Sequence, residues 1–481
     1  MNILLTFKLV GSVLLIESAL MLIPLAVSLF TGGADAGALT AALAVSIGVG
    51  GLLSLLRPKN DNLRAREGFA IVALSWILVS FFASLPFYFH GSIPSLVDCF
   101  FETVSGFTTT GATIMTDVIV LPKGLLFWRS FTHWAGGMGV LVLSLALLPK
   151  MGARTIHLLR AESPGPSVDK LVPRMGKNAK ILYKLYVCLS LMMLAALLCT
   201  GMSLYDALIN VFGAAGTGGF SNYNTSVGAF NSPAVDIIIG VFMALFGVNF
   251  SIYYYVLRRN WKQCLKNGEL RLYVALLLGS SVIIALNILP QYGYDFFHAL
   301  RFSFFQVSSV MTTTGYSTAN FDLWPQLSRS ILVTLMVIGA CAGSTGGGVK
   351  VIRVQLLLKS MVREVRRTIH PKSVNTIKQD GHAVDEQMLS GVMSFFFAYM
   401  LVTIVSTLIV SLDGFSFETN LTAVIATLSN IGPGLGTVGP MGNFSQFSDL
   451  SKIVLSLCML IGRLEIFPIL MLASPSAWRK Y

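Results

Sequence analysis

Ten long apolar segments constrain the fold of this chain more than any other feature of its sequence. Each approaches or exceeds the roughly 20 residues that a helix needs to cross a bilayer. They lie at about 4–30, 38–56, 69–90, 125–148, 181–200, 234–257, 272–290, 330–358, 389–411 and 452–473. Of the 481 residues, 54% are hydrophobic and only 12% are charged, a balance outside the range of soluble domains. The sequence therefore predicts an all-α polytopic membrane protein with ten transmembrane helices. The first segment lacks the basic start and the cleavage site of a signal peptide, so we expect it to remain as a helix.

Lysines and arginines gather in some of the connections between these segments and avoid others. Basic connections lie at 57–66, 150–184, 258–271 and 359–378, whereas 31–37, 222–233 and 412–422 contain no lysine or arginine. Because basic loops stay on the cytoplasmic side, we expect a multi-pass protein of the cell (inner) membrane with both termini in the cytoplasm. This topology accounts for the formal net charge of +12 without a nucleic-acid partner. The basic loops can face anionic lipid or a soluble protein partner, and the sequence leaves both open.

A short apolar stretch followed by threonine and glycine comes after the third long segment. In "IPSLVDCFFETVSGFTTTGAT", the apolar part at about 94–107 is too short to cross a bilayer, so we expect a pore loop that enters the membrane and returns. Four such stretches lie between long apolar segments, at 94–120, 203–231, 295–325 and 416–445. In each, a glycine lies nine residues after an aligned position: Gly111 after Glu102, Gly219 after Asn210, Gly315 after Gln306 and Gly432 after Ala423. This repetition predicts four related units, of which the fourth is the most divergent.

The repeats predict two preliminary helices followed by four units of helix, pore loop and helix (M1-P-M2) around one pseudo-fourfold pore. The expected divisions are 1–68 for the preliminary helices, then 69–150, 151–258, 259–378 and 379–481 for the four units. Glycine permits conformations that aim successive carbonyl oxygens at an axis, and rings of such oxygens replace the water shell of a monovalent cation. The short helices would also direct their partly negative C-termini at the ion. The predicted filter residues are Thr109, Thr110, Gly111, Thr217, Gly218, Gly219, Thr313, Thr314, Gly315, Asn430, Ile431 and Gly432.

A glycine-rich break, "GACAGSTGGGVK" at 339–350, interrupts the long apolar segment of the third unit. Five glycines among small residues have poor helix propensity, so we expect a movable gate loop that lines the inner cavity; a tight helix crossing is the alternative. Arg463 lies within the last apolar segment, where a cation is costly. We expect it in the permeation path beside this loop; a structural ion pair is the alternative. The predicted gate residues are Gly343, Ser344, Thr345, Gly346, Gly347, Gly348, Lys350 and Arg463.

Over essentially its whole length, the chain resembles the TrkH/TrkG/KtrB superfamily of potassium transport subunits. Beyond the glycine loops, the resemblance rests on "WAGGMGVLVLSLALLP" (134–149), "AESPGP" (161–166), "GACAGSTGGGVKVIR" (339–353), "SNIGPGLG" (429–436) and "GRLEIFP" (462–468). It implies a pseudo-fourfold pore within one chain, a homodimer, and K⁺ as the transported ion. Glycine at all four filter positions favours potassium over sodium. The fourth unit has Asn430, Ile431, Gly432 and Pro433 in place of the threonine run, and its fewer hydroxyls suggest a looser filter than the homotetrameric "TVGYG" type.

The same resemblance implies regulation by a soluble nucleotide-binding ring of the TrkA type, docked on the cytoplasmic loops 150–184 and 359–388. The two preliminary helices and "AESPGP" resemble the Trk-type branch of the superfamily. The sequence contains no fingerprint of a catalytic or nucleotide site, and its six cysteines show no metal or disulfide pattern, so we expect neither an enzyme nor an organic cofactor. An alternating-access secondary transporter coupled to H⁺ or Na⁺ is the alternative function. Such a protein would show inverted repeats, whereas these four repeats all enter from the same side.

Overall fold

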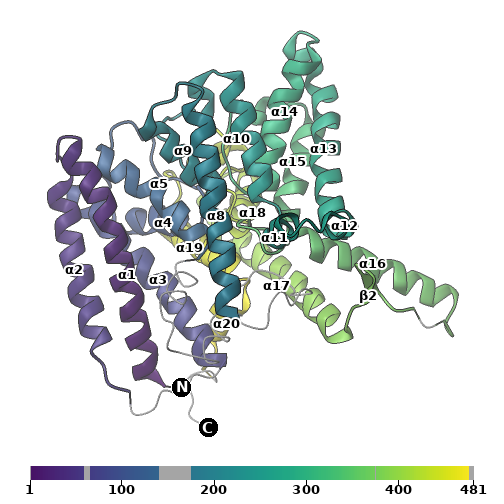
Figure 1. Cartoon of the computed structure of the whole chain (residues 1–481), viewed down its shortest axis with the longest axis horizontal. Coiled ribbons are helices and arrows are strands. Elements are labelled where there is room, and N and C mark those ends of the chain that lie inside the picture. Colours follow the sequence, from purple (N-terminus) through teal and green to yellow (C-terminus); the bar gives the residue numbers. More distant parts are fainter. Residues whose placement is uncertain (1, 59–64, 140–174, 374, 476–481) are drawn as a thin grey trace.

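The computed structural model describes residues 2–58, 65–139, 175–373 and 375–475, and this part of the chain is mostly helical (Figure 1). The "AESPGP" motif and most of the predicted basic loop at 150–184 lie outside the described residues. The helices are α1 (Ile3–Phe30), α2 (Ala36–Ser54), α3 (Ala65–His90), α4 (Leu96–Phe107), α5 (Lys123–Gly137), α8 (Met175–Leu198), α9 (Leu204–Gly216), α10 (Pro233–Phe246), α11 (Phe250–Leu257), α12 (Trp261–Lys266), α13 (Gly268–Ile288), α14 (Phe296–Met311), α15 (Gln326–Ile338), α16 (Val351–Ile369), α17 (Glu386–Val410), α18 (Phe417–Leu428), α19 (Asp449–Arg463) and α20 (Phe467–Ala473). Short 3₁₀ turns are η2 (Ser226–Phe230), η3 (Leu289–Tyr292), η4 (Phe321–Leu323), η5 (Ser411–Asp413) and η6 (Gly436–Val438). Strands β1 (Lys378–Gln379) and β2 (His382–Ala383) pair as an antiparallel hairpin.

Helices α1 and α2 form a closely packed antiparallel pair at one edge of the molecule, beside α3 (Figure 1). Small residues allow the close approach: a Cβ on Gly11 would lie 2.8 Å from the Gly50 carbonyl oxygen and 2.6 Å from the Leu53 Cβ. Close contact of this kind is how apolar helices associate in lipid, where the hydrophobic effect gives no drive between helices.

A long helix, a short helix and a second helix occur four times in chain order. These units are α3–α4–α5, α8–α9–α10, α13–α14–α15 and α17–α18–α19. Each short helix begins at a residue whose side chain accepts a hydrogen bond from a backbone N–H of the first turn: Ser95, Ser203, Asp295 and Ser416. Such caps satisfy N–H groups that would otherwise lack a partner. The four short helices therefore start by the same local device in four different sequences.

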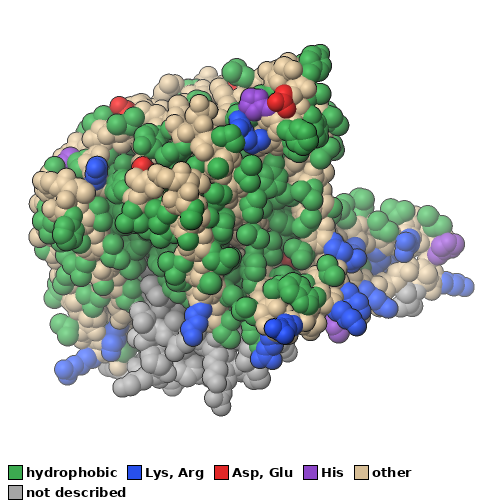
Figure 2. Space-filling view, turned by 45° about the horizontal axis from the view of Figure 1, so that its top comes forward, with side chains coloured by type: hydrophobic (Ala, Val, Ile, Leu, Met, Phe, Trp, Pro, Cys, Tyr) green, Lys and Arg blue, Asp and Glu red, His purple; other side chains and the backbone are tan. Residues whose placement is uncertain are grey.

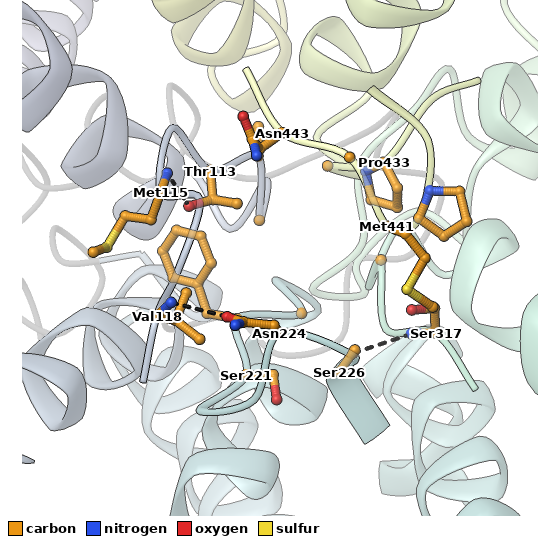
Figure 3. Close-up of a pocket in the computed structure, with 18 of the residues that line it drawn as sticks. Thr113, Met115, Val118, Ser221, Asn224, Ser226, Ser317, Pro433, Met441 and Asn443 are labelled. Atoms are coloured by element: carbon orange, nitrogen blue, oxygen red, sulfur yellow. Dashed lines mark hydrogen bonds between the residues drawn. The ribbon is translucent and has the colours of Figure 1, made fainter. Parts of the chain in front are cut away.

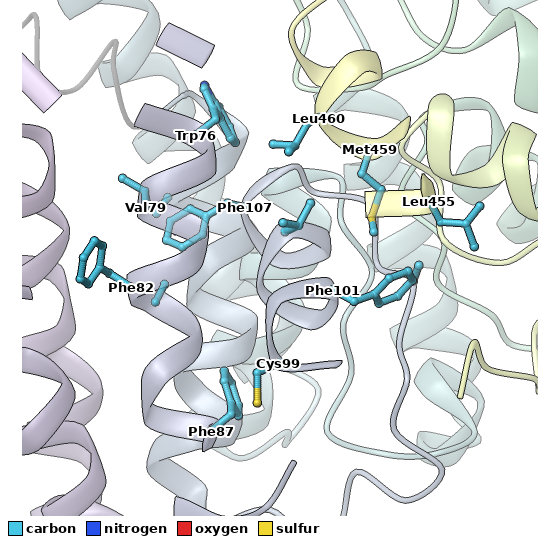
Figure 4. Packing of buried hydrophobic residues seen from close by; sticks show 14 of the residues in the cluster. Trp76, Val79, Phe82, Phe87, Cys99, Phe101, Phe107, Leu455, Met459 and Leu460 are labelled. Carbon is cyan, nitrogen blue, oxygen red and sulfur yellow. The ribbon is translucent and has the colours of Figure 1, made fainter. Parts of the chain in front are cut away.

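The four units close into a ring, because each short helix packs against its own unit and against the second helix of the preceding unit. Helix α9 contacts α5, α14 contacts α10, α18 contacts α15, and α4 contacts α19. The last of these contacts joins the fourth unit to the first. Figure 4 shows it: Phe101 of α4 points toward Leu455 and Met459 of α19, while Cys99 lies against Phe87 of α3.

The second helix is broken in more units than the sequence predicted. Helical geometry stops between Ile338 and Val351, within the segment where the break was expected. The apolar stretch 234–257 is also broken, since α10 and α11 meet at 92°, and the stretch 452–473 is broken between α19 and α20. The physical reasons are local in both cases. Asn249 caps the start of α11 with its side chain, and proline near the start of α20 cannot continue a preceding helix.

The described residues include six helices that are individually long and apolar enough to cross a membrane, or seven if the bent pair α10–α11 counts as one. Three broken second helices account for most of the difference from ten, and the expected segment 125–148, which contains α5, lies partly outside the described residues. The count of ten stays a prediction. Figure 2 shows hydrophobic side chains over most of the body, whereas Lys and Arg gather along its lower edge and on a projection to one side. In Figure 1 this projection is the region of α16, the β1–β2 hairpin and the start of α17.

Candidate functional site

The predicted filter residues follow the C-terminal ends of the four short helices, and the backbone there is the same four times. In each unit, the N–H of the residue before the filter glycine donates to the carbonyl five residues earlier: Thr110 to Ser105 (2.9 Å), Gly218 to Gly213 (2.8 Å), Thr314 to Ser309 (2.8 Å) and Ile431 to Ala426 (2.8 Å). This bond belongs to the Schellman motif, which ends helices with one residue in the left-handed conformation.

The left-handed residue is not glycine in any of the four segments. It is Thr109 (φ 56°), Thr217 (57°), Thr313 (58°) or Asn430 (57°). The filter glycine two positions later also has positive φ, between 77° and 97°. A non-glycine residue in this region costs about 1–3 kcal/mol and persists only where the surroundings impose it. The surroundings of all four segments therefore impose the same strained backbone, including in the divergent fourth unit.

The four filter glycines contact one another's segments around a closed circuit. A Cβ added to Gly111 would overlap the Gly218 carbonyl oxygen, one on Gly219 the Thr314 oxygen, one on Gly315 the Ile431 oxygen, and one on Gly432 would lie 2.7 Å from the Thr110 oxygen. Each contact joins one unit to the next, and the last returns to the first. The four segments thus converge on a single axis. The positive φ disfavours any residue other than glycine at these positions, and the neighbouring carbonyl oxygens leave no space for a side chain.

Side chains tie the segments together differently from unit to unit. The hydroxyls of Thr108 and Thr110 lie 2.8 Å apart, and those of Thr312 and Thr314 lie 2.7 Å apart. In the fourth unit the Asn430 amide instead donates to Thr110 Oγ1 at 2.9 Å and to a carbonyl of α19. Asn430 therefore cross-links the fourth segment to the first, in a position where the sequence suggested only the loss of a hydroxyl.

A cavity of about 130 Å³ opens on one side of this ring and is lined by all four filter glycines. Figure 3 looks into it: Thr113, Asn224, Ser317 and Asn443 come from the loops that follow the four filter segments. The Asn224 side chain accepts a hydrogen bond from the Val118 N–H at 2.9 Å, which links the loops of the first and second units across the rim. We call this cavity the vestibule.

Polar side chains on the short helices hold the chain as it leaves three of the filter segments. Glu102 accepts from the Ile114 N–H at 2.9 Å, and Thr422 accepts from the Leu435 N–H at 2.9 Å. The amide oxygen of Gln306, turned toward the loop, accepts from the Thr318 N–H at 2.9 Å. Each donor lies three residues after the filter glycine. Glu102 and Gln306 are the aligned positions noted in the sequence, but in the fourth unit the sequence alignment pointed to Ala423 and missed Thr422 one residue earlier.

Behind the first filter segment, Glu102 also forms a fully buried ion pair with Arg129 of α5, 2.6 Å from Nε to Oε1. Arg129 reaches into the second unit as well, where it donates to the Ser221 carbonyl at 3.2 Å and lies over the Phe220 ring at 3.4 Å. His133, one turn further along α5, is 2.7 Å from the Gly106 carbonyl. Arg129 and His133 therefore both bond α5 to α4.

The predicted gate loop 339–350 lies against the filter on the side away from the vestibule. The Gly347 N–H donates to Thr313 Oγ1 at 2.6 Å, and a Cβ on Gly347 would overlap the Ser429 carbonyl oxygen. A Cβ on Gly346 would lie 2.8 Å from the Thr312 carbonyl oxygen. The loop therefore touches the third and fourth filter segments directly, and its glycines are needed for that approach.

Arg463, at the end of α19, connects this loop to the C-terminal end of α5. Its guanidinium donates to the Thr345 carbonyl of the loop at 2.9 Å and to the carbonyls of Gly136 and Gly137, the latter at 2.8 Å. Lys350 is buried and donates to the Gly346 carbonyl. The structure thus brings Arg463, Lys350 and the glycine run together, as the expected gate requires.

Glu465 forms an ion pair with Arg353, 2.6 Å away in the first turn of α16. This pair, 112 residues apart in sequence, joins the break between α19 and α20 to the helix that follows the gate loop. Gly343 and Ser344 shape the other end of the loop: Gly343 has φ 70° beside Asn249, and the Ser344 hydroxyl donates to the Cys341 carbonyl at 2.7 Å.

The chain is similar to known proteins over nearly its whole length. The family model "TrkH: Cation transport protein" matches residues 36–480. The Trk system potassium uptake protein TrkH of Salmonella typhimurium is 39% identical over 479 residues, which are 98% of this chain and 99% of that protein. TrkH of Halomonas elongata is 36% identical over the full length of both chains. The crystal structure of the potassium transporter TrkH from Vibrio parahaemolyticus superposes with a TM-score of 0.88 at 35% identity, covering both chains fully. The chain belongs to the TrkH family of cation transport proteins.

Proposed function

We propose that this protein takes up K⁺ across the cell membrane through a channel-like pore whose filter is the ring of four glycine-centred segments. The observation that carries the proposal is the closed circuit of contacts among Gly111, Gly219, Gly315 and Gly432. The identity of the ion comes from the relatives, which are named as potassium uptake proteins. The transported ion is the substrate, and the proposal involves no organic cofactor and no enzymatic reaction.

The backbone of the filter supports selection of a dehydrated cation. Alternating positive φ values at the threonine or asparagine and at the glycine let successive carbonyl oxygens face the axis. Four short helices end at the ring, and each C-terminus carries roughly half a negative charge, which favours cations over anions. The strained left-handed residues are held by bonds from the helices behind them, so the oxygens are arranged before an ion enters.

The contacts of loop 339–350 support a gate directly beneath this filter. In the arrangement described here, Arg463 places a positive charge and the loop places backbone at the exit of the ring. Opening requires the loop to move away from Thr313 and Arg463. A loop with five glycines can change conformation at modest cost, so a few kilocalories per mole decide between the two states.

The distribution of charge supports the proposed orientation, and the resemblance to Trk-type subunits supports the proposed partners. Lysines and arginines gather along the lower edge of the body and on the projection that contains α16 (Figure 2), which supports a cytoplasmic gate side, an outward-facing vestibule and both termini inside. A cytosolic nucleotide-binding ring of the TrkA type would reach the gate through the segment 359–388 and the loop at 150–184. A homodimer is the expected assembly in the bilayer.

Flux into liposomes that contain the purified protein tests the proposal. With K⁺, Rb⁺, Na⁺ and Li⁺ compared under an imposed potential, we expect K⁺ and Rb⁺ to pass fastest and the flux to follow the potential. Uptake that requires a proton or sodium gradient, and that does not follow the electrochemical gradient of K⁺, would contradict a channel-like pore. Such a result would favour coupled, alternating-access transport.

A further inference from the structure

The second filter segment lacks a support that the short helices give to the other three. In those units a side chain of the short helix accepts a hydrogen bond from the N–H three residues after the filter glycine. The aligned residue here is Asn210, which is one methylene shorter than Gln306, and its buried Oδ1 has no hydrogen-bond partner in the part of the chain that the structure describes. Helix α9 instead holds this stretch through Asp206, whose carboxylate accepts from the Asn222 side chain at 2.5 Å. The backbone beyond the second filter glycine is therefore less constrained by its own unit.

A tyrosine of the third unit contacts the second segment at this point. Tyr316 directly follows the third filter glycine, is 1% exposed, and its own carbonyl accepts from the Ser309 hydroxyl at 2.6 Å. Its hydroxyl lies 3.2 Å from the Phe220 carbonyl oxygen, and 3.3 and 3.4 Å from the carbonyl oxygens of Asn210 and Ile209. The last two oxygens lie within α9, where backbone N–H groups are their partners. Since the Phe220 oxygen is the nearest, the bond to it fixes the chain just beyond the second filter glycine.

The second unit makes room for this tyrosine, and the first unit encloses its partner. A Cβ on Gly213 of α9 would overlap the Tyr316 hydroxyl, so a larger residue there would displace the tyrosine. The Phe220 ring lies against two residues of α5: its centroid is 3.4 Å from Arg129 Cζ and 4.2 Å from the centroid of the His133 ring. Neighbouring units thus hold both the ring and the carbonyl of the residue that follows the second filter glycine.

We propose that Tyr316 is a positioning residue for ion selection, which acts by holding the Phe220 carbonyl and, through it, the second filter segment. This role rests on the proposed function of the four segments as a filter. Discrimination against Na⁺ weakens when carbonyl oxygens can move inward around the smaller ion. The second segment receives less support from its own short helix than the others do, so its oxygens depend most on a neighbouring unit. The Tyr316 hydroxyl therefore favours K⁺ without touching the ion.

K⁺ and Na⁺ fluxes into liposomes test this role, with thermal unfolding followed in detergent on the same samples. Tyr316→Phe removes only the hydroxyl and should lower the K⁺/Na⁺ flux ratio by roughly twofold to tenfold, the range of one neutral hydrogen bond. Gly213→Ala should lower the ratio in the same way, because its Cβ displaces the tyrosine. The matched control is Tyr205→Phe, at the opposite end of α9 from the filter. Its hydroxyl also joins two units, by donating to the Lys123 carbonyl at 2.7 Å, and its loss should leave the ratio unchanged.

Asn210→Gln separates a positioning role from a general loss of packing. Glutamine at this position can accept from the N–H three residues after the filter glycine, as Gln306 does in the third unit. In the N210Q background the second segment is held by its own short helix, so Y316F should lower the flux ratio much less than it does in the parent. The four proteins form a double-mutant cycle, which isolates the coupling between the two positions.

Two results overturn the role of Tyr316 while the parent remains selective for K⁺. The first is a Y316F ratio equal to that of the parent. The second is an equal loss of selectivity with and without N210Q, which means that Tyr316 does not act through the second segment. If Y316F does not fold, G213A decides by the same two criteria. A parent that passes K⁺ and Na⁺ equally well would instead contradict the proposed function, and the role of Tyr316 in ion selection would fail with it.

Discussion

Replacing Arg463 by alanine removes the side chain that fastens the gate loop to the rest of the pore. Its bond to the Thr345 carbonyl is a charge-assisted hydrogen bond across 118 residues of sequence, and such bonds contribute about 1.5–3 kcal/mol. If the loop keeps its other contacts, the ratio of closed to open states should fall by roughly 10-fold to 150-fold, since about 1.4 kcal/mol corresponds to a factor of ten.

The charge of Arg463 adds a second effect in the same direction. A K⁺ ion that passes about 5 Å from the guanidinium would be repelled by about 3 kcal/mol at an effective dielectric constant of 20. Both effects predict a higher K⁺ flux in R463A, by at least tenfold until another step limits transport. R463K separates them, because lysine keeps the charge but lacks the two separate nitrogens with which Arg463 reaches Thr345 and Gly137. The control is R258A, which removes an exposed arginine from the end of α11.

The assay is K⁺ uptake per folded molecule in liposomes, with thermal unfolding followed in detergent on the same samples. Higher flux with little change in melting temperature supports the gate role. If R463A shows lower flux per folded molecule together with a lower melting temperature, Arg463 is a structural anchor and the reasoning is wrong.

Three further predictions concern the filter, the loop and the support behind the filter. Gly111→Ser should lower the K⁺/Na⁺ flux ratio, because a Cβ overlaps the neighbouring segment and φ is 80° there; an unchanged ratio in single-channel or liposome recordings would remove Gly111 from the filter. Gly346→Ala should push the loop from the third filter segment and raise open probability in single-channel recordings, and a variant with parental gating would argue that the loop is not the gate. Glu102→Gln leaves Arg129 charged and buried and should destabilise the fold by about 3–5 kcal/mol, whereas Glu418→Gln, at a 43% exposed carboxylate, should cost about 1 kcal/mol or less in the same detergent unfolding assay.

The four glycine-centred segments could be located from the sequence because their determinants are local. Each segment is a capped short helix followed by a residue that accepts positive φ and a glycine two positions later, and this spacing repeats. The family was also recognisable from such local motifs. Repeat four was harder, because its support comes from Thr422 rather than from the aligned Ala423, and because Asn430 acts through a bond to Thr110 in the first unit.

A cap and a proline accompany the breaks in the second helices, but contacts between distant residues also hold them, so the sequence predicted only one of the breaks. The chain between α19 and α20 turns at Glu465 and Ile466, both with positive φ, and Glu465 is held there by Arg353. Apolar composition alone predicts one continuous helix for such a stretch. The contact between Gly347 and Thr313 could not be predicted from the sequence either. The sequence predicted a loop below the filter, but only the fold places it against the filter side chains.

Anomalous scattering from Rb⁺ bound to the protein tests the central claim most directly. In crystals grown with Rb⁺ as the only alkali cation, at a concentration where the liposome assay shows Rb⁺ flux, the filter account predicts peaks on the axis enclosed by Gly111, Gly219, Gly315 and Gly432. The peaks should lie within coordination distance of carbonyl oxygens from all four segments and should weaken when Na⁺ replaces Rb⁺. Peaks that lie off this axis, with none inside the ring, would contradict the assignment of these four segments as the filter.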